Sequence, residues 1–484
     1  MDAYVLLTEK MKTIILKQYP SIRDFAKACG VPHGTVVSAL TKGLGGTSFS
    51  NVYKMCSCLD VNIDELFLLL ENEDKKSGFQ NRICSYAKGV NSNNTFRGIY
   101  CNPSADGFAE IINSECFVDK TNIIKHTNKY ISTTNKYICV SRPRRFGKTV
   151  AANILTAYYS KGADAYNLFN GYKIFGDREF SKHINKYNVI KLNILNFYTR
   201  EHQLYRMLKN ISESIIHDLL KQYGDMISDD DYIDEALSKI YISTGVKFVF
   251  IIDEWDCLLR MQRGNPFDTK DYFDYLRFLL KDREYVALAY MTGILPIKKY
   301  GEHSALNMFR EYSMTDAGEL GEYVGFTEDE VRCLCDKYDL AYDDMKSWYD
   351  GYYIGEAGYI YNPKSVVEAI SRRQYDNYWT QTESYEALKV YIEMNFDGLK
   401  DDIIKMLAGD RIKISIRKFQ NDMTSLNSKD DVMTLLVHLG YLTYDRTDSA
   451  VYIPNHEIFD EYVNAVEGAG WNDIIKRQKS IVVG

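Results

Sequence analysis

The chain has 484 residues, of which 45% are hydrophobic and 26% charged, a globular composition with material for roughly three domains of about 150 residues each. A formal net charge of -7 excludes a protein that coats nucleic acid by bulk attraction, so any such contact needs a local patch. The 10 cysteines include no C-x-x-C pair and no apolar run reaches membrane-spanning length, so we expect a cytoplasmic protein without a membrane partner, a disulfide framework or a zinc site.

Residues 1–71 predict a small all-helical domain. The segment "SIRDFAKACG" places Ser21 as an N-cap and Gly30 as a helix stop, and "VPHGTVVSALTKG" follows with a turn and a second helix. A helix ending in glycine, a turn of a few residues and a helix with small polar residues form the helix-turn-helix layout.

This region resembles the Cro/repressor-type DNA-binding domains, whose last helices often read like the "VNIDELF" found here. The resemblance implies that DNA is a partner and that four residues face the major groove, namely His33, Thr35, Ser38 and Lys42. Between residues 1 and 70, however, seven basic residues are nearly balanced by six acidic ones, and phosphate contacts dominate DNA affinity. A protein-contact module therefore stays open as the alternative.

Residues 72–98 are polar and rich in Asn, Ser and Gly, and they predict a linker. After it, "VSRPRRFGKTVAA" ends in the Gly-Lys-Thr of a phosphate-binding loop, but Arg142 stands where the pattern G-x-x-x-x-G-K-[ST] opens with glycine. An apolar run at 136–140 predicts a strand before the loop, and 149–159 predicts a helix after it. At such a turn backbone N–H groups hold phosphate oxygens, a lysine adds charge at the outer phosphates and a threonine hydroxyl reaches Mg²⁺. The matching residues are Gly147, Lys148 and Thr149.

A second element, "KFVFIIDEWD" (247–256), predicts a strand buried on both faces that ends in two carboxylates. Asp253 would reach the Mg²⁺ and Glu254 would activate the attacking water. A further strand at 285–295 places Thr292 as a polar sensor near the terminal phosphate, and 188–195 supplies another. The alternation of strands and helices predicts an open α/β sheet with its ligand at the strand carboxyl ends.

Over residues 99 to 462 the chain resembles the bacterial AAA-ATPase-like family, whose members are similar to AAA and STAND ATPases. The shared segments, in order, are "VDKTNIIKH", "SRPRRFGKT", "IIDEWD", "TGILPIKKYGEHSALNMFREY", "GFTEDEV", "WYDGYYIGEAGYIYNPKSV" and "IPNHEIF". In that family R-P-R-R-F-G-K-[ST] is the normal loop, so Arg142 is an expected departure from the general pattern. The resemblance implies ATP and Mg²⁺ as cofactors, bound by Arg142, Pro143, Arg144, Arg145, Phe146, Gly147, Lys148, Thr149 and Val150. We expect Pro143 to stiffen the loop and the arginines to add positive charge beside the phosphates, with a solvated basic loop as the alternative.

The segments after the ATPase core predict a helical lid and a winged-helix-like domain. "GFTEDEV" begins the lid with Thr327 as an N-cap and Glu330 three residues later, which is a capping box. The aromatic stretch 348–363 is interpreted as core packing around a glycine-rich hairpin. For the winged-helix-like domain, DNA contact and autoinhibitory docking both stay open. The predicted boundaries are 1–71 (helix-turn-helix), 72–98 (linker), 99–322 (P-loop core), 323–384 (lid), 385–466 (winged-helix-like) and 467–484 (tail).

These motifs predict an ATP-hydrolysing switch ATPase with a DNA-binding amino-terminal module, acting in nucleotide-dependent regulation or in defence against foreign DNA. The alternative is a transcriptional regulator or interaction scaffold that binds ATP but scarcely hydrolyses it. No nuclease activity is expected, because the residues after the winged-helix-like segment contain no Glu-x-Lys or Asp-x-Lys. A homo-oligomer and an effector chain stay open as partners, and Arg310 is weighed as an arginine finger against a surface arginine.

Overall fold

The computed structural model describes residues 12, 15–42, 51, 54–55, 58–59, 96–261, 266–297, 306–379, 388, 390–392, 396, 398–419 and 426–468. The chain divides into two compact units, each described below by itself. The first contains 1–94 and 166–171, and the second contains 95–165 and 172–484.

Two helices of the first unit lie in the segments where the sequence predicts them. Helix α2 (Ile22–Cys29) starts at Ser21, whose side chain accepts a hydrogen bond from the Asp24 amide, and it stops at Gly30, which has φ 64°. Helix α3 (His33–Lys42) follows after a short turn, and its residues Val36 and Ala39 are fully buried. His33 and Ser38 are exposed and Thr35 is half-buried, while the side chain of Lys42 lies outside the described residues. The other helices predicted between 4 and 70 fall largely outside them too.

The second unit is built on a five-stranded parallel sheet with the order β2-β3-β4-β1-β5. Every residue of β1, β3 and β4 is buried, which explains why these strands read as continuous apolar runs in the sequence. The predicted open α/β sheet is confirmed. The strands are β1 (Tyr137–Ser141), β2 (Asn188–Asn193), β3 (Phe248–Asp253), β4 (Val286–Gly293) and β5 (Arg310–Tyr312).

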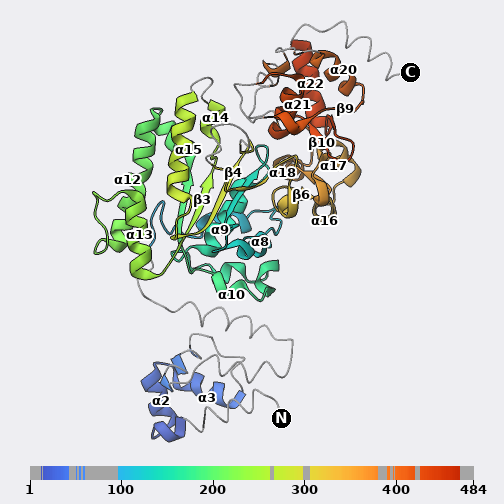
Figure 1. Ribbon diagram of the computed structural model, residues 1–484. Helices are drawn as coiled ribbons and strands as arrows, with labels where there is room; N and C mark the ends of the chain where they lie inside the picture. The colour runs from blue at the N-terminus through green and yellow to red at the C-terminus, as the bar shows by residue number, and fades with distance from the viewer. Residues whose placement is uncertain are drawn as a thin grey trace. The chain divides into compact units, whose positions relative to one another are not determined.

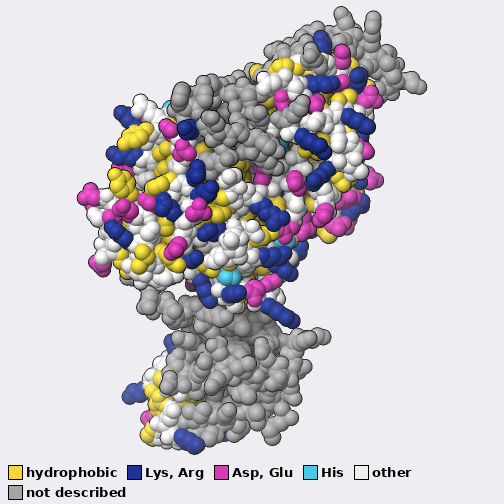
Figure 2. All heavy atoms as spheres, viewed as in Figure 1, with side chains coloured by type: hydrophobic (Ala, Val, Ile, Leu, Met, Phe, Trp, Pro, Cys, Tyr) yellow, Lys and Arg dark blue, Asp and Glu magenta, His cyan; other side chains and the backbone are white. Residues whose placement is uncertain are grey.

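Helices cover both faces of this sheet (Figure 1). On one face α12, α13 and α15 pack into the largest apolar core, against strand residues such as Phe250 and Ile252, and α9 lies on the other face. No described helix combines the length and the apolar character needed to cross a membrane. On the face drawn in Figure 2, basic and acidic side chains are interspersed over this unit. The helices are α7 (Asp106–Ile112), α8 (Ile123–Tyr130), α9 (Lys148–Tyr159), α10 (Phe180–His183), α11 (Ile194–Arg200), α12 (Leu204–Tyr223), α13 (Ile233–Thr244), α14 (Cys257–Met261) and α15 (Pro266–Leu280), and the 3-10 turns are η3 (Lys173–Gly176) and η4 (Gly318–Tyr323). The 3-10 turn η2 (Tyr166–Phe169) belongs to the first unit.

The segment that follows the sheet folds around a small antiparallel sheet with the order β6-β8-β7. The predicted capping box is present, because Thr327 accepts from the Glu330 amide while Glu330 accepts from the Thr327 amide. Tyr349, Tyr352 and Tyr361 are buried, so the aromatic stretch is core packing, as interpreted from the sequence. The elements are β6 (Phe326–Thr327), α16 (Glu328–Tyr338), α17 (Tyr342–Tyr349), β7 (Tyr352–Tyr353), η5 (Gly355–Ala357), β8 (Tyr359–Tyr361) and α18 (Pro363–Arg372).

The carboxyl-terminal region contains, in order, a helix, a glycine, a strand, a turn and a strand. Helix α21 ends at Gly440, which has φ 91°, and the strands form an antiparallel sheet with the order β10-β11-β9. All side chains from Asp431 to His438 are buried, so the helix placed to read DNA in a winged helix presents no open face over this stretch. The elements are α20 (Leu399–Leu407), β9 (Ile412–Lys413), η7 (Ile416–Lys418), α21 (Lys429–Leu439), β10 (Thr443–Asp445), β11 (Ala450–Tyr452) and α22 (His456–Gly468).

Helix α22 carries a carboxylate into this interior. Glu457 is 1% exposed, and its oxygens accept hydrogen bonds from the Ser365 hydroxyl and from the amides of Tyr378 and Trp379. Burial raises the pKa of Glu457 to about 7, although these hydrogen bonds and the charge of Arg145 favour the ionised form.

This raised pKa predicts a pH dependence of stability. Because the folded chain holds the Glu457 proton more tightly than the unfolded chain, this group lowers the free energy of unfolding as the pH rises from about 4.5 to about 7, by up to about 3 kcal/mol. Glu457→Gln keeps an oxygen for the two amides and cannot ionise, so it is expected to gain stability relative to wild type between pH 5 and pH 8. Urea unfolding of both proteins at pH 5 and pH 8 measures their free energies of unfolding. The same change in this free energy between the two pH values in both proteins would contradict the prediction.

Candidate functional site

The loop between β1 and α9 has the backbone of an anion-binding turn. Gly147 precedes the helix with φ 89°, and Arg145 also has a positive φ, of 68°. Because the first N–H groups of a helix have no partner within it and lie at the positive end of its dipole, the start of α9 offers donors to a negatively charged ligand.

Lys148 reaches back across this loop. Its Nζ donates to the backbone oxygens of Arg142 at 3.0 Å and Pro143 at 2.9 Å. Burial lowers the pKa of Lys148, an effect opposed by the carboxylates of Glu254 and Asp253. The loop therefore curls around its own cation, with two acids close by.

Asp253 joins three of the predicted site residues at the carboxyl ends of the central strands. Its Oδ2 accepts from the Thr149 hydroxyl at 2.8 Å, and its Oδ1 accepts from the Thr292 hydroxyl and from the amide of Glu254. The parallel pairing of β3 with β4 brings Asp253 and Thr292 together, and α9 supplies Thr149. A hydroxyl and a carboxylate held side by side at a phosphate loop are ligands suited to Mg²⁺.

Glu254 follows directly and has a positive φ of 54°. Its carboxylate forms an ion pair with Arg260, whose Nε also donates to Asp256 at 3.1 Å. Asp256 is fully buried and accepts from the amides of Ile294 and Leu295. The sequence analysis missed Arg260 and Asp256, although their spacing of four on a helix start is a signal for such a pair.

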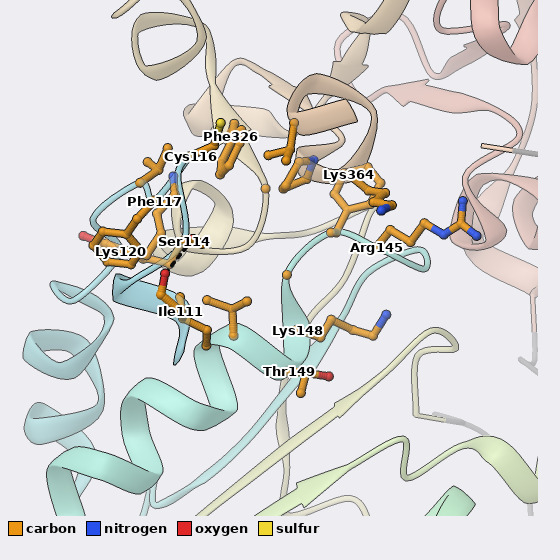
Figure 3. Close-up of a pocket in the computed structure, with 18 of the residues that line it drawn as sticks. Ile111, Ser114, Cys116, Phe117, Lys120, Arg145, Lys148, Thr149, Phe326 and Lys364 are labelled. Atoms are coloured by element: carbon orange, nitrogen blue, oxygen red, sulfur yellow. Dashed lines mark hydrogen bonds between the residues drawn. The ribbon is translucent and has the colours of Figure 1, made fainter. Parts of the chain in front are cut away.

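Lys148, Thr149 and Glu254 border a cavity of about 710 Å³ (Figure 3). Lys148 and Thr149 lie on its loop side, and Ile111, Phe117 and Phe326 lie away from them, so one end is polar and the other is mostly apolar. The lining combines Arg144, Arg145, Phe146, Gly147, Lys148, Thr149, Val150 and Glu254 with Glu110, Ile111, Ser114, Cys116, Phe117, Val118, Lys120, Tyr323, Gly325, Phe326, Pro363, Lys364 and Val367. The walls outside the loop were not predicted.

Arg142 lies apart from the loop residues that line the cavity. Its side chain is fully buried and does not line the cavity, and its Nη1 donates to the backbone oxygens of Ser141 at 2.8 Å and Tyr312 at 3.1 Å. Burial lowers the pKa of Arg142 to about 10. Its guanidinium therefore lies beside the edge strand β5, and its predicted contact with phosphates stays a prediction.

Arg310 lies away from the cavity. It is exposed on β5, where its guanidinium packs over the rings of Tyr130 and Tyr312 and donates to the Tyr130 hydroxyl at 3.1 Å. Within this chain it has the contacts of a surface arginine.

Lys120 connects the cavity wall to the lid. Its Nζ donates to the backbone oxygen of Glu322 at 2.6 Å and forms an ion pair with Glu330 at 2.5 Å. Burial lowers the pKa of Lys120, while Glu330 favours its charged form. The capping-box glutamate of α16 thus also anchors the lid to the core, which the sequence motif alone did not reveal.

Comparison with known proteins agrees with this geometry. Residues 104–301, which contain the loop and Asp253, match the sequence model of a family described as predicted AAA-ATPase. No curated protein matches the chain.

Several solved structures align with most of the chain at low similarity. A Walker-type ATPase of Pyrococcus abyssi is 10% identical with a TM-score of 0.34, and the alignment covers 71% of this chain and 94% of that one. The ORC2 protein of Aeropyrum pernix, in complexes with ADPNP and ADP, is 11% identical with a TM-score of 0.33, covering 74% and 97%. Cdc6p from Pyrobaculum aerophilum is 12% identical with a TM-score of 0.25, covering 72% and 93%.

The lid anchor can be tested by Lys120→Met. Lys120 is buried and Glu330 is half-buried, and the substitution leaves Glu330 without its cation, so we expect a loss of about 2 kcal/mol in the free energy of unfolding. Lys125→Met is the matched control, since Lys125 is 57% exposed and 3.7 Å from Asp177, and its loss is expected below about 1 kcal/mol. Urea unfolding decides, and equal losses in the two variants would contradict the anchor.

Proposed function

We propose that this chain is a P-loop ATPase of the AAA-like switch type that binds ATP with Mg²⁺ in the cavity described above. The observation that carries the proposal is the hydrogen bond between Thr149 and Asp253, beside a loop that curls around Lys148. A metal-binding hydroxyl, its carboxylate partner and a phosphate-binding cation thus meet at the start of one helix.

Each residue has a role that follows from its position. The amides at the start of α9 bind phosphate oxygens, and Lys148 binds the outer phosphates. Thr149 and Asp253 would hold Mg²⁺, which when bound neutralises charge on the transferred phosphate. Glu254 orients and deprotonates the attacking water, and Thr292 fixes the Asp253 carboxylate. The mostly apolar end of the cavity, near Phe117 and Phe326, suits the flat base.

A second candidate function is ATP binding with very slow hydrolysis. The ion pair between Glu254 and Arg260 favours it, because the arginine occupies the carboxylate that would otherwise orient the attacking water. Glu254 would have to leave this pair before it could act on water. In that case nucleotide would mainly fix the positions of the lid and the core. Single-turnover hydrolysis with purified protein, with and without DNA, separates the two functions.

Two substitutions separate binding from chemistry. Lys148→Ala deletes a charge-assisted contact worth roughly 1.5 to 3 kcal/mol, so ATP affinity should fall about 10- to 150-fold. Glu254→Gln keeps the shape but removes the base, so it should leave ATP affinity near wild type and slow hydrolysis. Calorimetric titration and phosphate release measure the two effects. Wild-type turnover in Glu254→Gln would reject Glu254 as the base.

We also propose that the amino-terminal helices bind duplex DNA, so that the ATPase acts in nucleotide-dependent regulation or in defence against foreign DNA. The exposure of His33 and Ser38 on α3, after the glycine stop of α2, supports this role. An effector chain or a second copy of this chain could receive the signal. A protein-contact role for the same helices is the alternative.

The DNA proposal predicts two kinds of variant in the full chain. Binding should be weak and should fall with rising salt, because phosphate contacts dominate it. Lys42→Ala should weaken binding to all sequences alike, whereas Ser38→Ala and Thr35→Ala should change the preference among sequences. Fluorescence anisotropy with a pool of duplexes at several salt concentrations tests this. A folded protein that binds no duplex even at low salt would favour the protein-contact role.

A further inference from the structure

The phosphate-binding loop has partners far along the chain. Arg145, which lines the cavity, donates through its Nη1 to the backbone oxygens of Tyr378 and Trp379, both at 2.9 Å. These residues lie in the segment that follows α18, more than 230 positions after the loop.

Two further loop residues contact the same half of the chain. The ring of Phe146 packs edge-on against Tyr352 with centroids 5.1 Å apart, and the Tyr352 hydroxyl donates to the backbone oxygen of Gly440. A side chain at Gly440 would come within 2.8 Å of Pro143. The loop therefore packs against the lid hairpin and the end of α21 as well as its own sheet.

The backbone of the loop is strained at Arg145, and these contacts can hold it in place. Arg145 has φ 68°, a left-handed conformation that is strained for a residue with a side chain and persists only when its surroundings enforce it. Gly147, with φ 89°, adopts its conformation without such a cost. Hydrogen bonds from Arg145 to two fixed carbonyls are the kind of restraint that can hold the strained conformation.

Glu457 fixes those carbonyls. Its Oε1 accepts from the amides of Tyr378 at 2.8 Å and Trp379 at 2.7 Å, the same two residues whose carbonyls accept from Arg145. The carboxylate also accepts from Ser365 on α18, and that helix begins with the cavity residues Pro363 and Lys364. One buried side chain thus holds both the turn behind the loop and one wall of the cavity.

We propose that Glu457 is a positioning residue of the nucleotide site, which holds the 378–379 turn so that the turn holds Arg145 and with it the phosphate-binding loop. This inference rests on the proposed function, because it takes the phosphates of ATP as the ligand of the loop. Loss of the restraint lets the loop relax, and the binding of phosphates must then restore the strained conformation.

The test is calorimetric titration of the full chain with Mg²⁺ and ATP at pH 8. Glu457→Ala and Arg145→Ala should each raise the Kd about tenfold. The Kd of the double variant should not exceed that of the single variant with the higher Kd, because both substitutions remove the same restraint. Glu457→Gln keeps the acceptor for both amides and should restore wild-type affinity. In steady state, Glu457→Ala should raise KM and leave kcat unchanged, since Glu254 and Asp253 are untouched.

Glu461 provides a matched control. It is equally buried one turn further along α22, but it accepts from the side chain of Asn377 and not from the two turn amides. Glu461→Ala should lower the thermal midpoint while changing the Kd less than twofold. Should Glu457→Ala fail to fold, Glu457→Asp, which withdraws the carboxylate by one methylene, is expected to show the same rise in Kd.

The outcomes separate the two proposals. Wild-type Kd in Glu457→Ala or Glu457→Asp, or independent losses that add in the double variant, would overturn the positioning role. Equal losses in Glu457→Ala and Glu461→Ala would do the same, because they would indicate a general weakening of α22. A wild-type chain that binds no ATP would instead refute the proposed function.

Discussion

The arrangement of the site depends on the hydrogen bonds that the carboxylate of Asp253 accepts. It accepts from Thr149 on α9, from Thr292 on β4 and from the amide that follows it, so it joins the start of α9 to the two central strands. Since β3 and β4 are buried along their whole length, the carboxylate is held at one edge of a rigid sheet. The positions of the loop and of Lys148 within it follow from that edge. The lid is then attached to the core through Lys120.

Much of the local structure was readable from the sequence because it is fixed by neighbours in the chain. Continuous apolar runs gave the buried strands, and the alternation with helices gave a parallel sheet. Ser21, Gly30, Thr327 and Glu330 mark helix ends through contacts within four residues, and all four act as predicted. The grouping of Lys148, Thr149, Asp253 and Thr292 followed from the rule that ligands bind at the carboxyl ends of parallel strands.

What the sequence did not reveal depends on the direction of long side chains and on contacts distant in the chain. A basic loop indicates positive charge, but it does not indicate which partner each arginine contacts. Arg142 donates to the backbone oxygen of Tyr312, whereas Arg145 donates to those of Tyr378 and Trp379. The ion pair of Glu254 with Arg260 depends on a tight turn at a residue with positive φ. Glu457 lies in the segment "IPNHEIF", in which the sequence assigned no functional role to any residue, and only tertiary packing makes it a buried acceptor.

The carboxyl-terminal region illustrates how one outline can serve two purposes. Its order of helix, glycine and strands suits DNA binding as well as docking, and the two differ in whether α21 has an open face. Here the side chains of Asp431 to His438 are buried, and Gly440 at the helix end lies against Pro143 of the loop. A helix packed in this way lies against the loop and cannot enter a groove without first leaving it. Of the two uses that the sequence left open, the packing favours docking, and the proposed DNA contact then rests on α3, where His33 and Ser38 are exposed.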